Sequence, residues 1–468
     1  MAHATNPYAL DESQIDDPPS SFFGKLKYLG PGLILSASIV GSGELIATTA
    51  LGAKAGFVAL WVILASCLVK VMCQIEFGRH AIHSGETTFQ AFNQFPGPHF
   101  GKGNWSVWVW LILMIVKPLQ VGGIIGGVGI AMNMLVPTVP VMVWVVITAP
   151  IVSLLIFQGW YVLIERLSIA MIGLFTIFTM ACLAAIQMTD FAIAFPDIVG
   201  GFHIFEKLPP EVLAVAIAAF GITGVGGDEI MMYNYWLLEK GYAAKTGPRQ
   251  ENDAWLKRAK GWMKVMYLDA LLAMVVYTLM TVAFYLLGAA ILNKQGLTPE
   301  GYTMITTLSR MYTDSVGPWA GPVFTIGAVF VLFSTLFSAL AGWSRLYTDA
   351  FGAIGLIDFS NPRHRKITIA LLAWFFPILW AVLFKFFEEP VFMVLAGGTI
   401  TSVILLLVVV AAIQFRFKRL PAELKPNLLY DVALMISIIA ILALAFLAVK
   451  GSVEKFQEKS AAKVVKVP

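Results

Sequence analysis

The fold depends on a stretch near the middle of the chain, residues 221–232, which reads GITGVGGDEIMM. It lies inside an apolar segment long enough to cross a bilayer, yet clustered glycines are followed directly by Asp228 and Glu229. Glycine is a poor helix former, and a carboxylate in hydrocarbon needs a partner or water. Irregular backbone at that depth is tolerated only where it lines a cavity or is buried in protein. The pattern therefore predicts a membrane helix that unwinds at a functional site.

A second stretch of the same kind occurs near the N-terminus. Residues 41–44 read GSGE near the middle of another apolar run, so Glu44 is again a carboxylate beside glycines. The two stretches fall in the first and sixth predicted spans. This placement matches transporters built from inverted repeats, in which spans 1–5 mirror spans 6–10. In that plan, freed carbonyls and half-helix ends become ligands for the substrate.

Apolar runs of about twenty residues recur along most of the chain. The sequence is 58% hydrophobic and 13% charged, with mean hydropathy +0.79, which is too little charge for the surface of a soluble domain. We therefore expect an all-α polytopic membrane protein. No basic stripe with interleaved aromatics indicates nucleic-acid binding. The predicted spans, about eleven in all, are 30–54, 56–78, 106–134, 140–158, 164–187, 212–238, 266–292, 319–344, 367–386, 390–414 and 428–449.

The distribution of Lys and Arg predicts the orientation. These residues are concentrated in alternate connections, above all between residues 240 and 264, which favours a cytoplasmic N-terminus in a cell (inner or plasma) membrane. The basic C-terminal tail departs mildly from this rule. The polar first residues lack a signal-peptide pattern. The expected domains are a flexible cytoplasmic tail (1–28), a transporter domain (29–449, with repeat one about 29–188, repeat two about 211–415 and an extra helix about 428–449) and a polar tail (450–468).

In the sixth predicted span the chain has Ile230, Met231 and Asn234. These residues fall on the Ile-Met-Pro-His-Asn stretch of the sixth span in the Nramp family of divalent-metal transporters, which the chain resembles. The resemblance implies a LeuT-like fold of the APC superfamily, with two five-helix repeats and about one extra helix. The other matching positions are Leu29-Gly30-Pro31-Gly32, Ala53-Lys54-Ala55-Gly56-Phe57, Leu60-Trp61, Gln74, Arg79, Gly85 and Asp269-Ala270-Leu271.

The sequence departs from the family's pattern at the metal site. Where the family has Asp-Pro-Gly-Asn, Gly41 replaces a metal-binding Asp and Glu44 replaces the Asn. Met231 keeps the family's thioether ligand, whereas Asp228 stands where the family usually has an alanine that binds through its carbonyl. Tyr233 replaces the family's His. The scaffold therefore resembles Nramp, while the substrate site differs.

The third span lacks the acidic residues that the family links to proton transfer. Val121 and Ile124 fill two of those positions, and Lys117 is the only charge there. Gly397 replaces a Gln of the tenth span. Nramp-related magnesium transporters are similar in having altered ligands and a missing proton pathway. The resemblance thus implies transport driven by the membrane potential and not coupled to protons in the usual Nramp way.

The first substrate hypothesis is a divalent metal cation, with magnesium or manganese favoured, because Glu44 and Asp228 supply hard oxygen ligands. It would be a transported ion moved by alternating access; no bound cofactor is expected. The candidate substrate or metal ligands are Glu44, Asp228, Met231, Gly41, Ser42, Gly43 and Gly227. The candidate coupling or gating residues are Glu229, Lys117, Tyr233, Asn234, Asp269 and Thr399.

The second hypothesis is an amino acid or another small organic amine or zwitterion. The Gly41-Ser42-Gly43 stretch also resembles the first-span turn of amino-acid transporters with this fold, in which open backbone N–H groups hold a carboxylate. Lys117 could act there as a counter-ion or as a proton-carrying amine. A third hypothesis is a sensor or scaffold that does not transport. An enzyme is not expected, because no histidine has catalytic spacing. The favoured oligomeric state is a monomer in the lipid bilayer.

Two further features of the second span have structural interpretations. Lys70 and Glu76 could form an internal pair, or Lys70 could extend toward the inner face. The cysteines are Cys67, Cys73 and Cys182, and all three are expected to be apolar filler.

Overall fold

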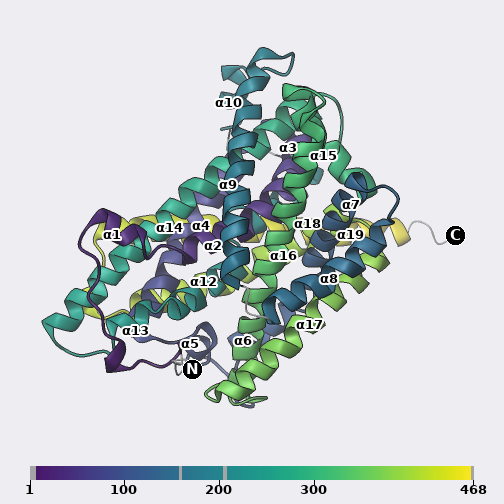
Figure 1. Cartoon of the computed structure of the whole chain (residues 1–468). Helices are drawn as coiled ribbons and strands as arrows, with labels where there is room; N and C mark the ends of the chain where they lie inside the picture. The colour runs from purple at the N-terminus through teal and green to yellow at the C-terminus, as the bar shows by residue number, and fades with distance from the viewer. Residues whose placement is uncertain (1–6, 158–160, 204–207, 465–468) are drawn as a thin grey trace.

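The structure is a computed structural model that describes residues 7–157, 161–203 and 208–464. Within these ranges the backbone alone is described for residues 33, 37, 42, 161–169 and 448–464. The chain is almost wholly helical, and the helices cross one another in a thick bundle (Figure 1). The single strand pair, β1 (His99–Phe100) with β2 (Gly103–Asn104), is a short antiparallel hairpin among the described residues.

Each predicted span corresponds to a helix or a run of helices. The first half of the chain contains η1 (Glu12–Gln14), α1 (Phe22–Leu26), α2 (Pro31–Ile39), η2 (Val40–Thr48), α3 (Thr49–Ala55), α4 (Leu60–Ser84), α5 (Thr88–Phe92), α6 (Trp105–Leu113), α7 (Pro118–Leu135), α8 (Val141–Phe157), α9 (Tyr161–Ala185), η3 (Ile186–Met188) and α10 (Phe195–Gly200).

The second half of the chain is also built almost entirely of helices. It contains α11 (Pro210–Ile222), α12 (Gly227–Glu239), α13 (Tyr242–Thr246), α14 (Asp253–Leu287), η4 (Gly288–Asn293), η5 (Gly301–Thr303), α15 (Met304–Val316), α16 (Ala320–Ala353), α17 (Pro362–Phe387), α18 (Pro390–Gln414), η6 (Phe415–Arg419), η7 (Ala422–Leu424) and α19 (Leu428–Val464). The last helix therefore continues into the region expected to be a polar tail.

The sixth span is broken where the glycines predict it. Helix α11 ends at Ile222 and α12 begins at Gly227, and the residues between them are not helical. Gly224 has φ +62°, a conformation that side-chain-bearing residues rarely adopt. The prediction of a broken span is confirmed here.

The first span is wound differently from the prediction. Residues 31–55 are continuously helical, and the expected unwound stretch is a π-helix, η2, with wider turns and i→i+5 bonding. A Cβ on Gly41 would lie 1.6 Å from Thr335 Oγ1, and one on Gly43 would lie 2.7 Å from the carbonyl oxygen of Ile222. The glycines therefore allow close packing against α16 and α11, and the prediction of an unwound first span was wrong.

The third span is also interrupted, which the sequence reading missed. Helix α6 ends at Leu113, a turn follows, and α7 begins at Pro118. Lys117 is the residue immediately before α7, and its side chain is 1% exposed. The break places this lysine inside the bundle.

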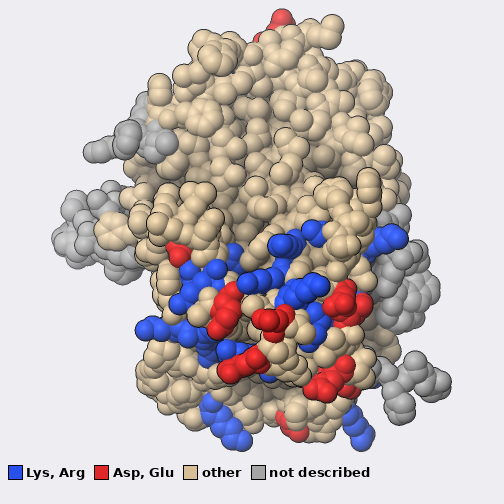
Figure 2. Space-filling model, turned by 90° about the vertical axis from the view of Figure 1, so that its left-hand side faces the viewer, with Lys and Arg blue, Asp and Glu red and all other residues tan. Residues whose placement is uncertain are grey.

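The described residues contain nine helices that are long and apolar enough to cross a membrane, by length and composition. The shorter apolar helix α8 and the α2–η2–α3 run account for the remaining predicted spans. Figure 2 shows a face where charged side chains gather on one part and leave a broad uncharged area beside it. This face carries α1, α13 and the start of α14, whose sequence is rich in Lys and Arg.

The described part of the N-terminal segment, expected to be flexible, has specific contacts with the helices. Tyr8 donates a hydrogen bond of 2.5 Å to Glu239 on α12. Further along, the backbone N–H of Asp16 donates to the carbonyl of Lys245, and Trp262 Nε1 donates to the carbonyl of Asp16. These bonds attach the segment to α12, α13 and α14.

Candidate functional site

Glu44 lies on η2 and is fully buried. Its Oε1 accepts a hydrogen bond of 3.1 Å from the backbone N–H of Gly224 and one of 2.8 Å from Thr281 Oγ1 on α14. Its Oε2 is buried and has no hydrogen-bond partner among the described residues. The carboxylate therefore reaches across to the break between α11 and α12, and one oxygen remains unused.

Asp228 lies in the first turn of α12 and is 2% exposed. Lys117 Nζ lies 3.0 Å from its Oδ1, and Trp343 Nε1 on α16 donates to its Oδ2 at 2.9 Å. Lys117 also donates a short hydrogen bond to Thr401 Oγ1 on α18. A buried carboxylate needs such partners because desolvation of an unpaired charge is costly.

Glu229 follows Asp228, and its Oε2 is buried without a hydrogen-bond partner in the described part of the chain. It interacts electrostatically with Asp228, Lys117 and Lys70. Lys70 in turn interacts with Glu44. These contacts link five ionisable side chains, which we call the central cluster: Glu44, Lys70, Lys117, Asp228 and Glu229.

Lys70 is the member of the central cluster that the sequence reading did not assign to the site. It is on α4 and is fully buried, and its Nζ donates to the carbonyls of Phe220 at 2.7 Å and Thr223 at 2.5 Å. The sequence left open a pair with Glu76 or extension of Lys70 toward the inner face, and neither is observed. Glu76 is paired with Arg79 at 2.5 Å, and the buried lysine points to the end of α11.

Two other predicted ligands, Gly227 and Met231, have contacts with neighbouring helices. A Cβ on Gly227 would lie 2.8 Å from Ile404 Cγ2, so this glycine allows α18 to approach. Met231 is fully buried, and its carbonyl accepts a hydrogen bond of 3.0 Å from Thr88 Oγ1. The side chain of Ser42 lies outside the described residues.

Three of the predicted gating residues lie on other parts of the helices: Tyr233 and Asn234 in the middle of α12, and Asp269 on α14. Asp269 accepts hydrogen bonds from the backbone N–H groups of Gly30 at 2.9 Å and Gly32 at 2.6 Å, at the start of α2. Tyr233 donates to the same carboxylate at 3.0 Å. Asn234 Nδ2 donates to the carbonyl of Glu86 at 3.1 Å. These bonds join the starts of α2 and α5 to α12 and α14.

Thr399 has no described hydrogen bond to the central cluster. Its hydroxyl donates to the carbonyl of Leu395 within α18, at 3.1 Å. Thr401, two residues later, is the one bonded to Lys117. Residues at different positions on a helix point in different directions, and sequence spacing alone does not fix which threonine of α18 faces Lys117.

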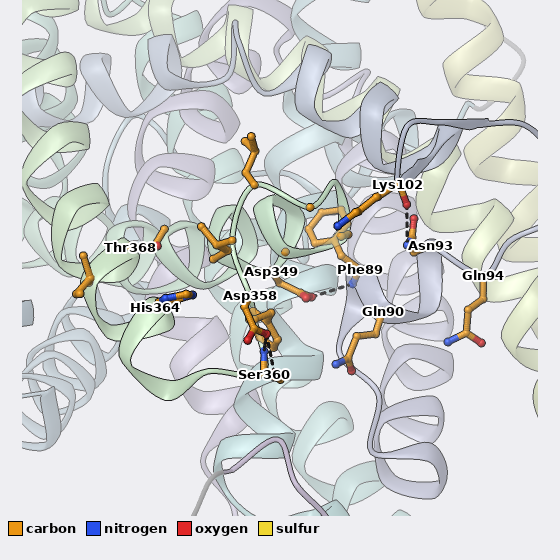
Figure 3. Close-up of a pocket in the computed structure, with 17 residues that line it drawn as sticks. Phe89, Gln90, Asn93, Gln94, Lys102, Asp349, Asp358, Ser360, His364 and Thr368 are labelled. Carbon is orange, nitrogen blue, oxygen red and sulfur yellow. Dashed lines mark hydrogen bonds between the residues drawn. The ribbon is translucent and has the colours of Figure 1, made fainter.

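A cavity of about 1040 Å³ lies between α5, the β1–β2 hairpin and the α16–α17 connection (Figure 3). Asp349 accepts a hydrogen bond of 3.0 Å from the backbone N–H of Phe89 there, and Tyr235 donates to the same oxygen. No carboxylate of the central cluster lines this cavity. Among the described residues, no group of three or more His, Cys, Asp or Glu side chains is arranged to hold a metal ion.

The fold and the central cluster define a class: a multi-pass helical membrane transporter with a broken sixth span and buried charges beside the break. A profile described as "Natural resistance-associated macrophage protein-like" (Nramp) matches residues 32–450. The chain therefore belongs to the Nramp family, which confirms the resemblance, and its activity is transport, not enzymatic catalysis.

The relatives are distant. An uncharacterised protein of Pasteurella multocida is 23% identical over 387 residues, which cover 78% of this chain and 80% of that protein. The divalent metal cation transporter MntH of Agrobacterium fabrum is 26% identical over 294 residues, covering 61% of this chain and 58% of that protein.

Solved structures agree on the fold. A variant of the Eremococcus coleocola manganese transporter superposes with a TM-score of 0.67 at 14% identity, covering 94% of this chain and 90% of that one. MhsT in complex with L-phenylalanine superposes with a TM-score of 0.53 at 15% identity, covering 92% of this chain and 100% of that one. The predicted LeuT-like architecture is confirmed.

Proposed function

We propose that this chain transports a divalent metal cation, with magnesium or manganese favoured, and that the carboxylates of the central cluster bind it. Membership of the Nramp family supports transport, and the name of the Agrobacterium relative supports a divalent cation. We further propose a monomer with a cytoplasmic N-terminus in the cell membrane. The basic connection between residues 240 and 264 supports this orientation.

The observation that carries the proposal is the pair of unused carboxylate oxygens. Glu44 Oε2 and Glu229 Oε2 are buried and have no hydrogen-bond partner among the described residues. They come from two elements: Glu44 on η2 accepts a hydrogen bond from Gly224 in the break, and Glu229 lies in the first turn of α12 after it. Oxygen ligands of this kind suit magnesium, manganese or calcium, and a hydrated ion could bind through one or two carboxylates.

Lys117 acts in this proposal as an internal counter-ion. It neutralises Asp228 at 3.0 Å, so a metal that binds Asp228 must displace the ammonium group or share the carboxylate with it. The third span offers no carboxylate to accept a proton in exchange, since Val121 and Ile124 are buried apolar residues. Transport is therefore proposed to proceed without proton coupling of the usual Nramp kind.

Uptake into liposomes tests the site assignment. The variants Glu44→Ala and Asp228→Ala should each abolish uptake of magnesium and manganese while remaining folded and inserted. Glu300→Ala, which removes an exposed carboxylate, is the matched control and should transport normally. Wild-type rates in both cluster variants would end the assignment.

An amino acid or organic amine remains the second candidate. The observation that favours it is the pairing of Lys117 with Asp228, because a zwitterion could bind both signs. The π-helical winding of Gly41-Ser42-Gly43 counts against it, since amide groups in a helix are engaged and not open to a carboxylate. The same liposomes, given magnesium, manganese and calcium in competition with amino acids and polyamines, separate the two candidates.

A further inference from the structure

The end of α11 forms a small cup of oxygen atoms around the Lys70 ammonium group. The carbonyls of Phe220 and Thr223 accept its hydrogen bonds at 2.7 and 2.5 Å. Ser66 Oγ, one helical turn before Lys70 on α4, lies 3.0 and 2.8 Å from the same two carbonyl oxygens. The lysine side chain is fully buried.

Burial of Lys70 and the nearby charge of Lys117 disfavour a positive charge in this cup, and several partners offset that cost. Helix α11 has 13 residues, and the last carbonyls of a helix carry the negative end of its dipole. The ring of Phe220 lies 5.2 Å from Lys70 Nζ, close enough for a cation–π contact. Glu44 and Glu229 add electrostatic attraction without forming an ion pair with Lys70 among the described residues. The lysine is therefore held mainly by backbone carbonyls.

Carbonyls freed at the end of a broken membrane helix are ligands that proteins use for mobile cations. Here a covalently attached ammonium group fills that position. We propose that Lys70 is a tethered cation that replaces an exchangeable monovalent ion at the end of α11, so that transport needs no sodium or potassium there. This inference rests on the proposed transport function and specifies its ion requirement.

The variant Lys70→Ala tests the inference, because it removes the ammonium and leaves the carbonyls in place. Melting temperature is measured in detergent without any divalent ion, in choline chloride, sodium chloride, potassium chloride or methylammonium chloride. The wild-type protein should melt at the same temperature in all four salts. In choline chloride, Lys70→Ala should have a lower melting temperature than the wild type. Sodium, potassium or methylammonium chloride should raise the melting temperature of this variant again. Lys54→Ala, which removes an exposed lysine, is the control and should behave like the wild type.

A second variant separates the charge from the hydrogen bonds. Lys70→Gln ends in a neutral amide with two N–H donors, one bond nearer the backbone than the ammonium group. A role limited to hydrogen bonding predicts normal folding and normal uptake in this variant. The tethered-cation role predicts normal folding with uptake reduced about tenfold or more, since a hydrogen bond to a charged group is stronger than a neutral one. Normal uptake by Lys70→Gln, or melting of Lys70→Ala that ignores the monovalent salt, would overturn the inference. The melting experiment contains no divalent ion, so its outcome is independent of the proposed substrate.

Discussion

At the scale of single residues, the Lys117–Asp228 pair makes a clear prediction. The variant Lys117→Met leaves Asp228 buried, with Trp343 as its remaining side-chain donor among the described residues. Removing one partner of a buried pair costs about 3–5 kcal/mol. We expect a lower melting temperature than in the wild type. Manganese or magnesium should raise it further than in the wild type, because the ion no longer competes with the ammonium group.

The control for this prediction is Lys366→Met, which removes an exposed lysine and should change neither melting nor the response to metal. The measurement is thermal melting in detergent over a series of metal concentrations. An unchanged melting temperature in Lys117→Met, with the wild-type response to metal, would contradict the pairing.

Some residues of the central cluster could be predicted from the sequence, and Lys70 could not. Glu44 and Asp228 could be found because a carboxylate in an apolar run is costly and needs a reason. Lys70 was linked to Glu76, six positions along the same helix, whereas its partners are carbonyls about 150 positions away on α11. Backbone carbonyls are present at every residue, so nothing in the sequence marks those of Phe220 and Thr223 as its acceptors.

At the scale of elements, the break between α11 and α12 depends on Gly224. The variant Gly224→Ala puts a side chain at φ +62°, and its Cβ would lie 3.1 Å from the Cα of Cys67 on α4. The left-handed conformation alone costs about 1–2 kcal/mol. We expect lower thermal stability and slower uptake, because the N–H of Gly224 also orients Glu44.

The matched control is Gly173→Ala on α9, where an added Cβ meets nothing within 4 Å. This exposed helical position should be unaffected or slightly stabilised, since alanine is the better helix former. Melting and uptake are measured on both variants. If Gly224→Ala and Gly173→Ala had the same melting temperature and the same uptake rate, the break would not require glycine at position 224.

The two glycine-rich stretches look alike in sequence but fold differently. In the first span, Thr48 Oγ1 donates to the carbonyl of Gly43 and Thr49 Oγ1 to that of Glu44, so side chains satisfy carbonyls within the wide π turns. In the sixth span, the freed carbonyls of Phe220 and Thr223 are satisfied by Lys70 from another helix. Clustered glycines therefore predict irregular backbone, while tertiary partners decide whether it stays helical.

The connection between α4 and α5 makes a prediction about pH. Burial opposes ionisation of Glu86, but hydrogen bonds from His80 and Gln94 and the charge of Arg419 on η6 outweigh it and lower the pKa of Glu86 from 4.5 to about 2. A lowered pKa in the folded state stabilises the fold above pH 4.5, and this contribution is lost as pH falls from 4.5 toward 2. The stability difference between wild type and Glu86→Gln should therefore shrink as the pH falls from 4.5 toward 2.

Melting temperatures of the two proteins at a series of pH values measure this difference. Groups that titrate alike in both proteins contribute equally to each melting temperature, so their contributions cancel. A difference that grows as the pH falls below 4.5 would show that the folded-state pKa of Glu86 is not lowered.

At the scale of the whole molecule, the central cluster joins the two predicted repeats. Repeat one contributes Glu44, Lys70 and Lys117, and repeat two contributes Asp228 and Glu229. The Lys117–Asp228 pair and the Lys70 hydrogen bonds to α11 therefore both cross from one repeat to the other. A movement of one repeat against the other, as alternating access requires, must weaken these contacts and expose the carboxylates.

This arrangement makes a final prediction about the driving force. A divalent ion that crosses the whole field carries two charges and gains about 4.6 kcal/mol per 100 mV, which can drive uptake without a proton gradient. In liposomes with a potassium diffusion potential, magnesium or manganese uptake should increase as the interior becomes more negative, and a trapped pH dye should report no acidification. Proton entry in fixed proportion to metal entry would contradict this. It would make Glu229 or Lys117 the candidate proton carrier, because the third span offers no carboxylate for that role.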